Sequence, residues 1–258
     1  MSGIPENMLK DFLEEKYRQY NCPGFIESDP VSIPHMFSNE PDIEISAFLS
    51  AIIAWGQRKT IIKNARLMMD LMDNSPSEFI MQATIPDIEA IRNFKHRTFN
   101  GEDLAYFLRS LQNIYRNHGG LRNVFESLYL KERSVFHSIC RFRDLFLSVS
   151  QPGRTTRHIS NPAAGSSAKR INMFLRWMVR KDKNSVDFGI WNRIRTDDLR
   201  IPLDVHTGNV SRKLGLLQRR QDDWKAVEEL TGKLRTFDKK DPVKYDFALF
   251  GLGVFEKF

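Results

Sequence analysis

Cysteine is scarce in this sequence, because only Cys22 and Cys140 occur among its 258 residues. Two cysteines exclude a disulfide-stapled scaffold, a four-cysteine zinc site and a cysteine-ligated iron–sulfur cluster. The six histidines show no metal-ligand spacing, so we expect neither a metal ion nor another cofactor. A cysteine-poor chain also fits a reducing compartment, and we expect a cytoplasmic, nucleoid-associated protein.

Long apolar runs are missing as well. No stretch approaches eighteen uncharged apolar residues, so the sequence predicts no transmembrane helix and no membrane partner. The first residues, MSGIPENMLKDFLEEKY, are amphipathic and acidic without an apolar centre, and we expect no signal peptide there. No Walker A, G-x-G-x-x-G, H-E-x-x-H or G-x-S-x-G motif occurs, which argues against the enzyme classes that those motifs mark.

Sequence patterns typical of β-structure are also weak. No Asn-Gly turn joins two alternating runs, and we interpret Asn100-Gly101, which lies between helical segments, as a loop. Helical spacing of apolar residues is present almost throughout. It predicts helices near residues 43–54, 59–72, 102–118, 121–130, 133–149, 169–181, 205–216, 223–234 and 242–255. The sequence therefore predicts an all-α protein.

The segment 151–167, QPGRTTRHISNPAAGSS, has the composition of a loop. We expect it to separate an N-terminal helical lobe over residues 1–150 from a C-terminal lobe over 151–258, the two forming one unit. Its end, residues 161–167, forms a tight turn that leads into a helix bearing Lys169. Backbone N–H groups at a helix N-terminus behind a glycine turn can bind a phosphate group.

The charge distribution is uneven along the chain, whose net charge is +7. Residues 1–100 contain ten Lys and Arg against fourteen Asp and Glu, whereas residues 141–181 contain nine against one. Such polarisation is typical of a phosphate-binding face, although a solvated basic surface gives the same pattern. Arg170, Arg176 and Arg180 recur along the Lys169 helix, interleaved with Phe174 and Trp177. This pattern favours phosphate contact by at least one of them.

Two motifs together resemble the helix-hairpin-helix DNA glycosylases. A Pro-x-x-Gly turn opens the lysine-bearing helix (NPAAGSSAKRINMF), and an apolar-apolar-Asp-x-His segment follows (IPLDVHTGNVSRKLGL). The early stretch FLSAIIAWGQRKTIIKNA is similar to the helix pair in which that superfamily places a glutamine near the target base. Most of the chain also resembles an uncharacterised bacterial family related to these enzymes.

The resemblance implies a helix-hairpin-helix, glycosylase-like fold and a function in base-excision repair. Lys169 would be the amine nucleophile and Asp204 would stabilise the sugar cation that develops as the base leaves. The hairpin and its surroundings would grip the phosphate backbone, and the base pocket would include Gln57, Trp55 and Trp177. The backbone contacts would come from Gly165, Ser166, Ser167, Arg170, Arg176, Arg180 and Arg212. Burial among aromatic residues would lower the pKa of Lys169, which we state as a hypothesis.

Two features depart from the common pattern of that superfamily. Its lysine usually lies two residues after the second glycine, a place that Ser167 occupies here, and the spacer from Lys169 to Asp204 is longer than usual. The archaeal 8-oxoguanine DNA glycosylases have a comparable spacer, so this resemblance favours Lys169 and a damaged purine such as 8-oxoguanine. If Ser167 is instead aligned with the usual lysine position, the site has no lysine, as in members of the superfamily that use the aspartate alone. The sequence also ends without the cysteines of a cluster.

Less specific interpretations of the same residues stay open. Asp204 also fits a helix N-cap, Lys169 a solvated helix lysine, and the tryptophans core positions. The alternative function is a non-enzymatic helix-hairpin-helix protein that binds DNA or RNA, and a third is a helical protein whose basic face serves a protein partner. We expect a monomer that acts on double-stranded DNA, with possible AP lyase activity.

Overall fold

The computed structural model describes residues 5–149 and 153–258, and most of these residues are helical, so the predicted all-α class is confirmed. The chain divides into two compact units. Unit 1 comprises residues 1–25 and 161–258, and unit 2 comprises residues 26–160. The expected lobes, 1–150 and 151–258, differ from these units because the first helix packs on the last one and so joins the C-terminal unit.

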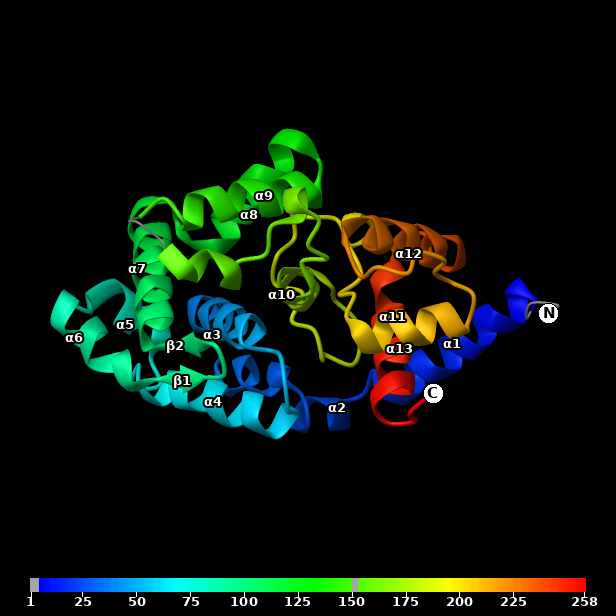
Figure 1. Ribbon diagram of the computed structural model, residues 1–258, viewed down its shortest axis with the longest axis horizontal. Coiled ribbons are helices and arrows are strands. Elements are labelled where there is room, and N and C mark those ends of the chain that lie inside the picture. The colour runs from blue at the N-terminus through cyan, green and yellow to red at the C-terminus, as the bar shows by residue number, and fades with distance from the viewer. Residues whose placement is uncertain (1–4, 150–152) are drawn as a thin grey trace. The chain divides into compact units, whose positions relative to one another are not determined.

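Unit 1 is built around a pair of helices from the two ends of the chain, which lie side by side in Figure 1. Gly251 allows this close approach, because a Cβ there would lie 2.1 Å from Cδ2 of Tyr20. Leucines and valines of several helices form the core beneath them. The helices of this unit are α1 (Glu6–Tyr20), α2 (Pro23–Glu27, which crosses the boundary), α10 (Lys169–Val179), α11 (Val205–Lys213), α12 (Trp224–Phe237) and α13 (Tyr245–Val254). Short 3-10 helices are η5 (Pro162–Ala164), η6 (Thr196–Asp198) and η7 (Pro242–Lys244).

Unit 2 is an α-helical bundle with one two-stranded hairpin. Its helices are α3 (Glu40–Ile52), α4 (Arg58–Asp70), α5 (Pro76–Gln82), α6 (Ile85–Ala90), α7 (Gly101–Asn117), α8 (Gly120–Glu132) and α9 (Val135–Phe146). Short 3-10 helices are η1 (Pro30–Ser32), η2 (Pro34–Met36), η3 (Ile91–Asn93) and η4 (Gly153–His158). The core is largely aliphatic and contains a group of phenylalanine rings, with Phe107 4.8 Å from Phe146 between ring centroids. Helices α8 and α9 pack side by side (Figure 1).

The hairpin corrects the interpretation of Asn100-Gly101 as a loop. Strands β1 (Lys95–His96) and β2 (Phe99–Asn100) pair antiparallel, and Asn100 then caps α7. The Asn100 side chain accepts a hydrogen bond from the backbone N–H of Asp103 at 3.1 Å, and Asp103 accepts one in return from the N–H of Asn100 at 3.0 Å. This reciprocal capping box stabilises the start of the helix. A strand of two residues is too short for its period to be recognised in a sequence.

The predicted loop over 151–167 contains two 3-10 turns, η4 and η5, while its first two residues lie outside the described part of the chain. The N-terminal residues 1–4 of the segment considered for a signal peptide also lie outside it. Among the described residues, no helix is both long enough and apolar enough to span a bilayer. Within the same residues, no group of three or more His, Cys, Asp or Glu side chains could hold a metal ion.

Candidate functional site

Lys169 is the first residue of α10, and its backbone setting is strained. Ala168, immediately before it, has φ of 49° in the left-handed region, where a residue with a Cβ is disfavoured by roughly 1–2 kcal/mol. The N–H of Ala168 donates to Oγ of Ser166 at 3.2 Å, and Oγ of Ser167 donates to the carbonyl of Leu203 at 3.2 Å. These bonds tie the start of α10 to the segment that precedes Asp204.

Asp204 lies at the N-cap of α11 and next to Lys169. Its Oδ1 accepts a hydrogen bond from the backbone N–H of Thr207 at 3.0 Å, so the N-cap interpretation is confirmed. Its Oδ2 lies 3.7 Å from Nζ of Lys169. The two side chains are 21% and 25% exposed, for Lys169 and Asp204 respectively. The predicted lysine and aspartate therefore form a half-buried ion pair that solvent can reach.

A second carboxylate, Asp246 on α13, lies in the interior close enough to act electrostatically on this pair. Arg176 of α10 bonds to Asp246 and also donates Nε to Oδ1 of Asp187 at 3.2 Å. Burial raises the pKa of Asp246 to about 7. Arg176 and Lys169 oppose that rise, and Asp204 and Asp187 add to it. The charges of the pair and of the buried cluster are thus coupled.

The interior face behind the pair contains polar atoms without partners. Thr207 and Ser211 follow Asp204 by three and seven positions, and Asn172 follows Lys169 by three, so each set shares one face of its helix. The side-chain oxygens Thr207 Oγ1, Ser211 Oγ and Asn172 Oδ1 are buried without a hydrogen-bond partner in the described structure. Such atoms are rare in folded proteins, but others, such as Ser50 Oγ and Ser110 Oγ, lie elsewhere in the described structure, so they do not by themselves mark a site.

Three residues predicted to contact nucleic acid lie in the core instead. Arg176 and Arg180 are buried, and Arg180 donates to Asp241 at 2.9 Å and to Asp187 at 3.0 Å. Their guanidinium groups are used to neutralise interior carboxylates, so the predicted phosphate contacts of Arg176 and Arg180 are wrong. Trp177 is also fully buried, which removes it from the predicted base pocket. The helical spacing that suggested a basic face could not show which side of α10 faces the core.

The remaining predicted backbone contacts are only partly accessible. Gly165 is exposed, with φ of 90°, whereas the hydroxyls of Ser166 and Ser167 are used within the protein. Arg170 is half-buried, and burial lowers its pKa to about 10. Arg212 donates to Asp222 at 2.5 Å and to the carbonyl of Arg219 at 2.8 Å. Of these five residues only Gly165 is exposed, and both arginines are half-buried.

Trp55 and Gln57 belong to unit 2 and lie just before α4. Trp55 is half-buried and stacks on His158, with ring centroids 5.9 Å apart. Gln57 is exposed and precedes the first residue of the helix, but its side chain makes no capping hydrogen bond. Both side chains therefore reach the surface of their own unit.

Sequence reasoning missed Asp246 and Asp187. The one available indication for Asp246 was an acidic residue inside YDFALFGLGV, the most apolar helical segment of the chain. A charge in such a segment is retained when it is paired in the interior. Asp187 lies in an irregular segment, and nothing in the local sequence indicates its burial.

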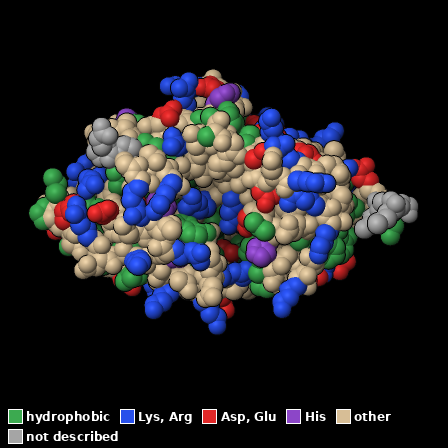
Figure 2. Space-filling view, in the orientation of Figure 1, with side chains coloured by type: hydrophobic (Ala, Val, Ile, Leu, Met, Phe, Trp, Pro, Cys, Tyr) green, Lys and Arg blue, Asp and Glu red, His purple; other side chains and the backbone are tan. Residues whose placement is uncertain are grey.

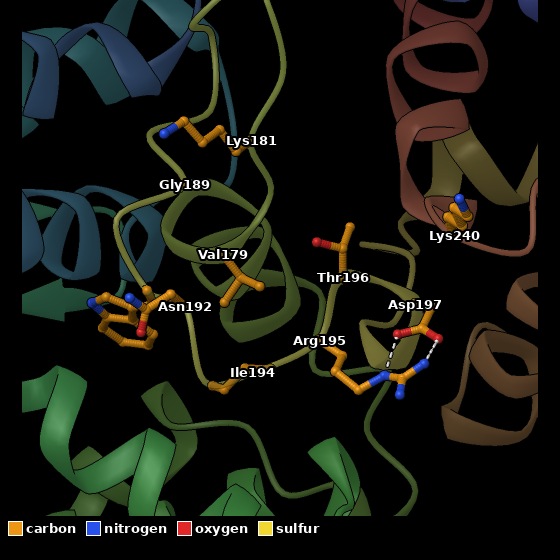
Figure 3. Close-up of a pocket in the computed structure, with 10 residues that line it drawn as sticks. Val179, Lys181, Gly189, Asn192, Ile194, Arg195, Thr196, Asp197 and Lys240 are labelled. Carbon is orange, nitrogen blue, oxygen red and sulfur yellow. Dashed lines mark hydrogen bonds and ion pairs between the residues drawn. The ribbon is translucent and has the colours of Figure 1, made fainter.

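Unit 1 also has a shallow cavity of about 430 Å³ that contains neither Lys169 nor Asp204. Figure 3 shows Arg195 paired with Asp197 at its edge, where Nε of the arginine lies 2.8 Å from Oδ1 of the aspartate. Lys181 and Lys240, also on its lining, are exposed. This cavity is therefore separate from the lysine–aspartate pair and contributes nothing to it.

Comparison with known proteins places this helical protein in a family. Residues 29–255 match the model of the family of proteins of unknown function DUF2400, and the chain belongs to that family. No curated protein and no solved structure matches the chain.

Proposed function

We propose that the protein is a DNA glycosylase with AP lyase activity that removes a damaged purine such as 8-oxoguanine. The observation that carries the proposal is the 3.7 Å separation of Lys169 Nζ and Asp204 Oδ2. The two groups come from different helices and are both partly open to solvent. An amine and a carboxylate at one accessible point are the groups that this reaction requires.

The strained backbone before Lys169 supports the proposal. A left-handed alanine persists only where its surroundings enforce it, and such strain concentrates at functional sites. A glycine turn, η5 with Gly165, also precedes α10, as expected for the hairpin of a helix-hairpin-helix motif. We extend the proposal to that fold, with the hairpin holding the strand through backbone N–H groups.

In the proposed reaction, the ammonium group of Lys169 gives a proton to water, and Asp204 stays ionised. The neutral amine bonds to C1′ of the extruded nucleotide as the C1′–N bond to the base breaks, and Asp204 stabilises the positive charge that develops on the sugar. The base leaves with the electron pair of the broken bond and takes up a proton from water. The C1′–O4′ bond then breaks, O4′ takes one proton from the attached nitrogen, and a protonated Schiff base remains. Loss of a C2′ proton to water finally expels the 3′ phosphate with the electron pair of its C3′–O bond.

Charge supports a nucleic-acid partner for unit 1. This unit contains 23 Lys and Arg against 17 Asp and Glu, whereas unit 2 contains 16 against 15, which together account for the 39 and 32 of the chain. A net positive unit attracts the phosphate backbone and raises the rate of encounter. We expect double-stranded DNA as the substrate, bound by a monomer.

Borohydride trapping tests the proposal. The protein is incubated with labelled duplexes that contain 8-oxoguanine or an abasic site, and the Schiff base is reduced to a stable adduct. We expect an adduct with the natural protein and with Lys213→Gln, an exposed lysine on α11, and none with Lys169→Gln. Absence of both adduct and base release across a panel of lesions would overturn the proposal.

A second candidate is a non-enzymatic nucleic-acid-binding protein. It is favoured by Asp204 Oδ1, which is already used to cap α11, so that the ion pair also has a purely structural explanation. This alternative predicts salt-sensitive binding of DNA or RNA that is unchanged in Asp204→Asn, with no strand product from either protein.

A further inference from the structure

Three arginines of unit 2 meet at the β1–β2 hairpin. Arg97 lies at its turn, between the two strands. Arg154 and Arg157 of η4 both donate Nη2 to the carbonyl of Thr98, at 2.7 and 3.0 Å. Two guanidinium groups that share one carbonyl oxygen are held only a few ångströms apart, next to the residue that carries the third.

A buried carboxylate fixes this arrangement. Asp103 at the start of α7 is fully buried and accepts hydrogen bonds from Oγ1 of Thr155 at 2.8 Å and from Arg154 at 3.1 Å. Nε2 of His158 also lies 3.4 Å from it. One aspartate thus anchors η4 through the side chains of Arg154 and Thr155, and it can offset only one positive charge of the cluster.

The turn that contains Trp55 and Gln57 borders the same cluster. The ring nitrogen Nε2 of His96 hydrogen bonds with the carbonyl of Trp55 at 3.2 Å, which docks the hairpin on this turn. Gly56 has φ of 103°, and a Cβ there would lie 2.9 Å from Nη1 of Arg97. The positive φ favours glycine at this position, where the Arg97 side chain lies against the backbone.

The cluster is exposed to solvent. The side chain of Arg154 is 47% exposed, and Arg97 and Arg157 are also exposed. Figure 2 shows Lys and Arg side chains gathered over the part of unit 2 near α7 and the segment that follows the grey trace. Like charges held this close repel one another, and an anion between them would relieve that repulsion. Guanidinium groups match phosphate oxygens in geometry and bind them with two parallel hydrogen bonds.

We infer that Arg97, Arg154 and Arg157 form a phosphate-binding site for the backbone of a DNA duplex. The half-buried ring of Trp55 and the exposed amide of Gln57 beside them favour a nucleic acid over a free anion, because they add stacking and hydrogen-bonding groups. The inference rests on the proposed function for the identity of its partner, and it assigns unit 2 its own contact with the backbone.

The test measures the salt dependence of binding to a labelled 8-oxoguanine duplex by fluorescence anisotropy. The variant Arg97→Gln/Arg154→Gln/Arg157→Gln is compared with Arg66→Gln/Lys131→Gln/Arg141→Gln, which removes the same charge from exposed positions of unit 2. We expect the slope of log K against log salt to fall by roughly two to three in the first variant, with affinity at low salt reduced on the order of 10- to 100-fold. The control should change the slope by less than about one.

Arg154 contacts the buried Asp103, so its replacement could unfold η4. Arg97→Glu avoids this contact and should weaken binding on its own. Equal slopes for the cluster variants and the control would overturn the inference, even if Lys169 still forms its adduct. A reduced slope in the cluster variants of a protein that forms no adduct would support the site while the glycosylase proposal fails.

Discussion

The two units solve the problem of a stable interior in different ways. In unit 2 the largely aliphatic interior contains a group of stacked and edge-on rings, Phe48, Phe107, Phe142 and Phe146. In unit 1 an apolar core coexists with two buried arginines, Arg176 and Arg180, and the aspartates that neutralise them. Aromatic ring pairs add a small gain to the area that they bury, whereas a buried ion pair recovers its desolvation cost only with complete pairing. The interior of unit 1 therefore depends on the complete pairing of its buried arginines and aspartates.

The largest expected effect comes from removing one arginine from the buried arginine–aspartate pairs of unit 1. Arg180→Met removes the arginine partner of Asp241 and one of the two arginines paired with Asp187, and we expect the free energy of unfolding to fall by about 3–5 kcal/mol. Urea unfolding measures it. The matched control is Arg195→Met, which breaks an exposed pair and should cost less than about 1 kcal/mol. An equal loss of unfolding free energy in the two variants would show that the buried pairs contribute no more to stability than the exposed pair.

The second effect is the pH dependence that Asp246 of unit 1 contributes to the free energy of unfolding. The folded-state pKa of Asp246 is raised from 3.8 to about 7, so its contribution to stability is complete below pH 4 and is lost as the pH rises through 7. A pKa raised this far corresponds to a contribution of at most about 4 kcal/mol. Asp246→Asn should flatten the unfolding free energy between pH 4 and 7. If the unfolding free energies of the natural protein and of the variant change by the same amount between pH 4 and 7, Asp246 is not the group responsible.

A smaller effect is expected in the aromatic core of unit 2. Phe107→Leu keeps the position apolar and nearly fills the space, so the unfolding free energy should fall by no more than about 1.5 kcal/mol and should not depend on pH. Thermal unfolding at pH 5 and pH 8 provides the measurement. A strong pH dependence of this loss would mean that the two interiors are not as different as the contacts indicate.

The smallest effect on stability separates the two roles of Asp204. Asparagine caps a helix as well as aspartate does, so Asp204→Asn should change the unfolding free energy by less than about 0.5 kcal/mol, whereas Asp204→Ala should cost about 1 kcal/mol. Both variants remove the carboxylate beside Lys169, and under the proposed function both should lose base release. If Asp204→Asn still releases the base, the carboxylate has no role in the reaction and Asp204 serves only as a helix cap.

Much of the secondary structure could be predicted because helices are encoded locally. The spacing of apolar residues predicted α3, α7 and α12 within a few residues. The hairpin was missed since two-residue strands have no measurable period. The resemblance gave Lys169 and Asp204 roles at one site, and the structure has Nζ of the lysine 3.7 Å from Oδ2 of the aspartate.

The direction of each arginine on α10 could not be predicted in the same way. In the sequence, Arg176 and Arg180 cannot be told apart from arginines on the surface. They are buried because they pair with Asp187, Asp241 and Asp246, which come later in the chain. Arg97, Arg154 and Arg157 show the reverse case. They are scattered in sequence, and only the fold brings them to one carbonyl.

The sequence by itself determined the helical class, the positions of most helices and the excess of positive charge, because these depend on local period and on composition. Tertiary structure alone decided which charges are interior, which carboxylate lies beside which amine, and which residues share a surface. Those properties depend on contacts between residues distant in the chain, where desolvation and pairing set the free energy and no local pattern records the partner.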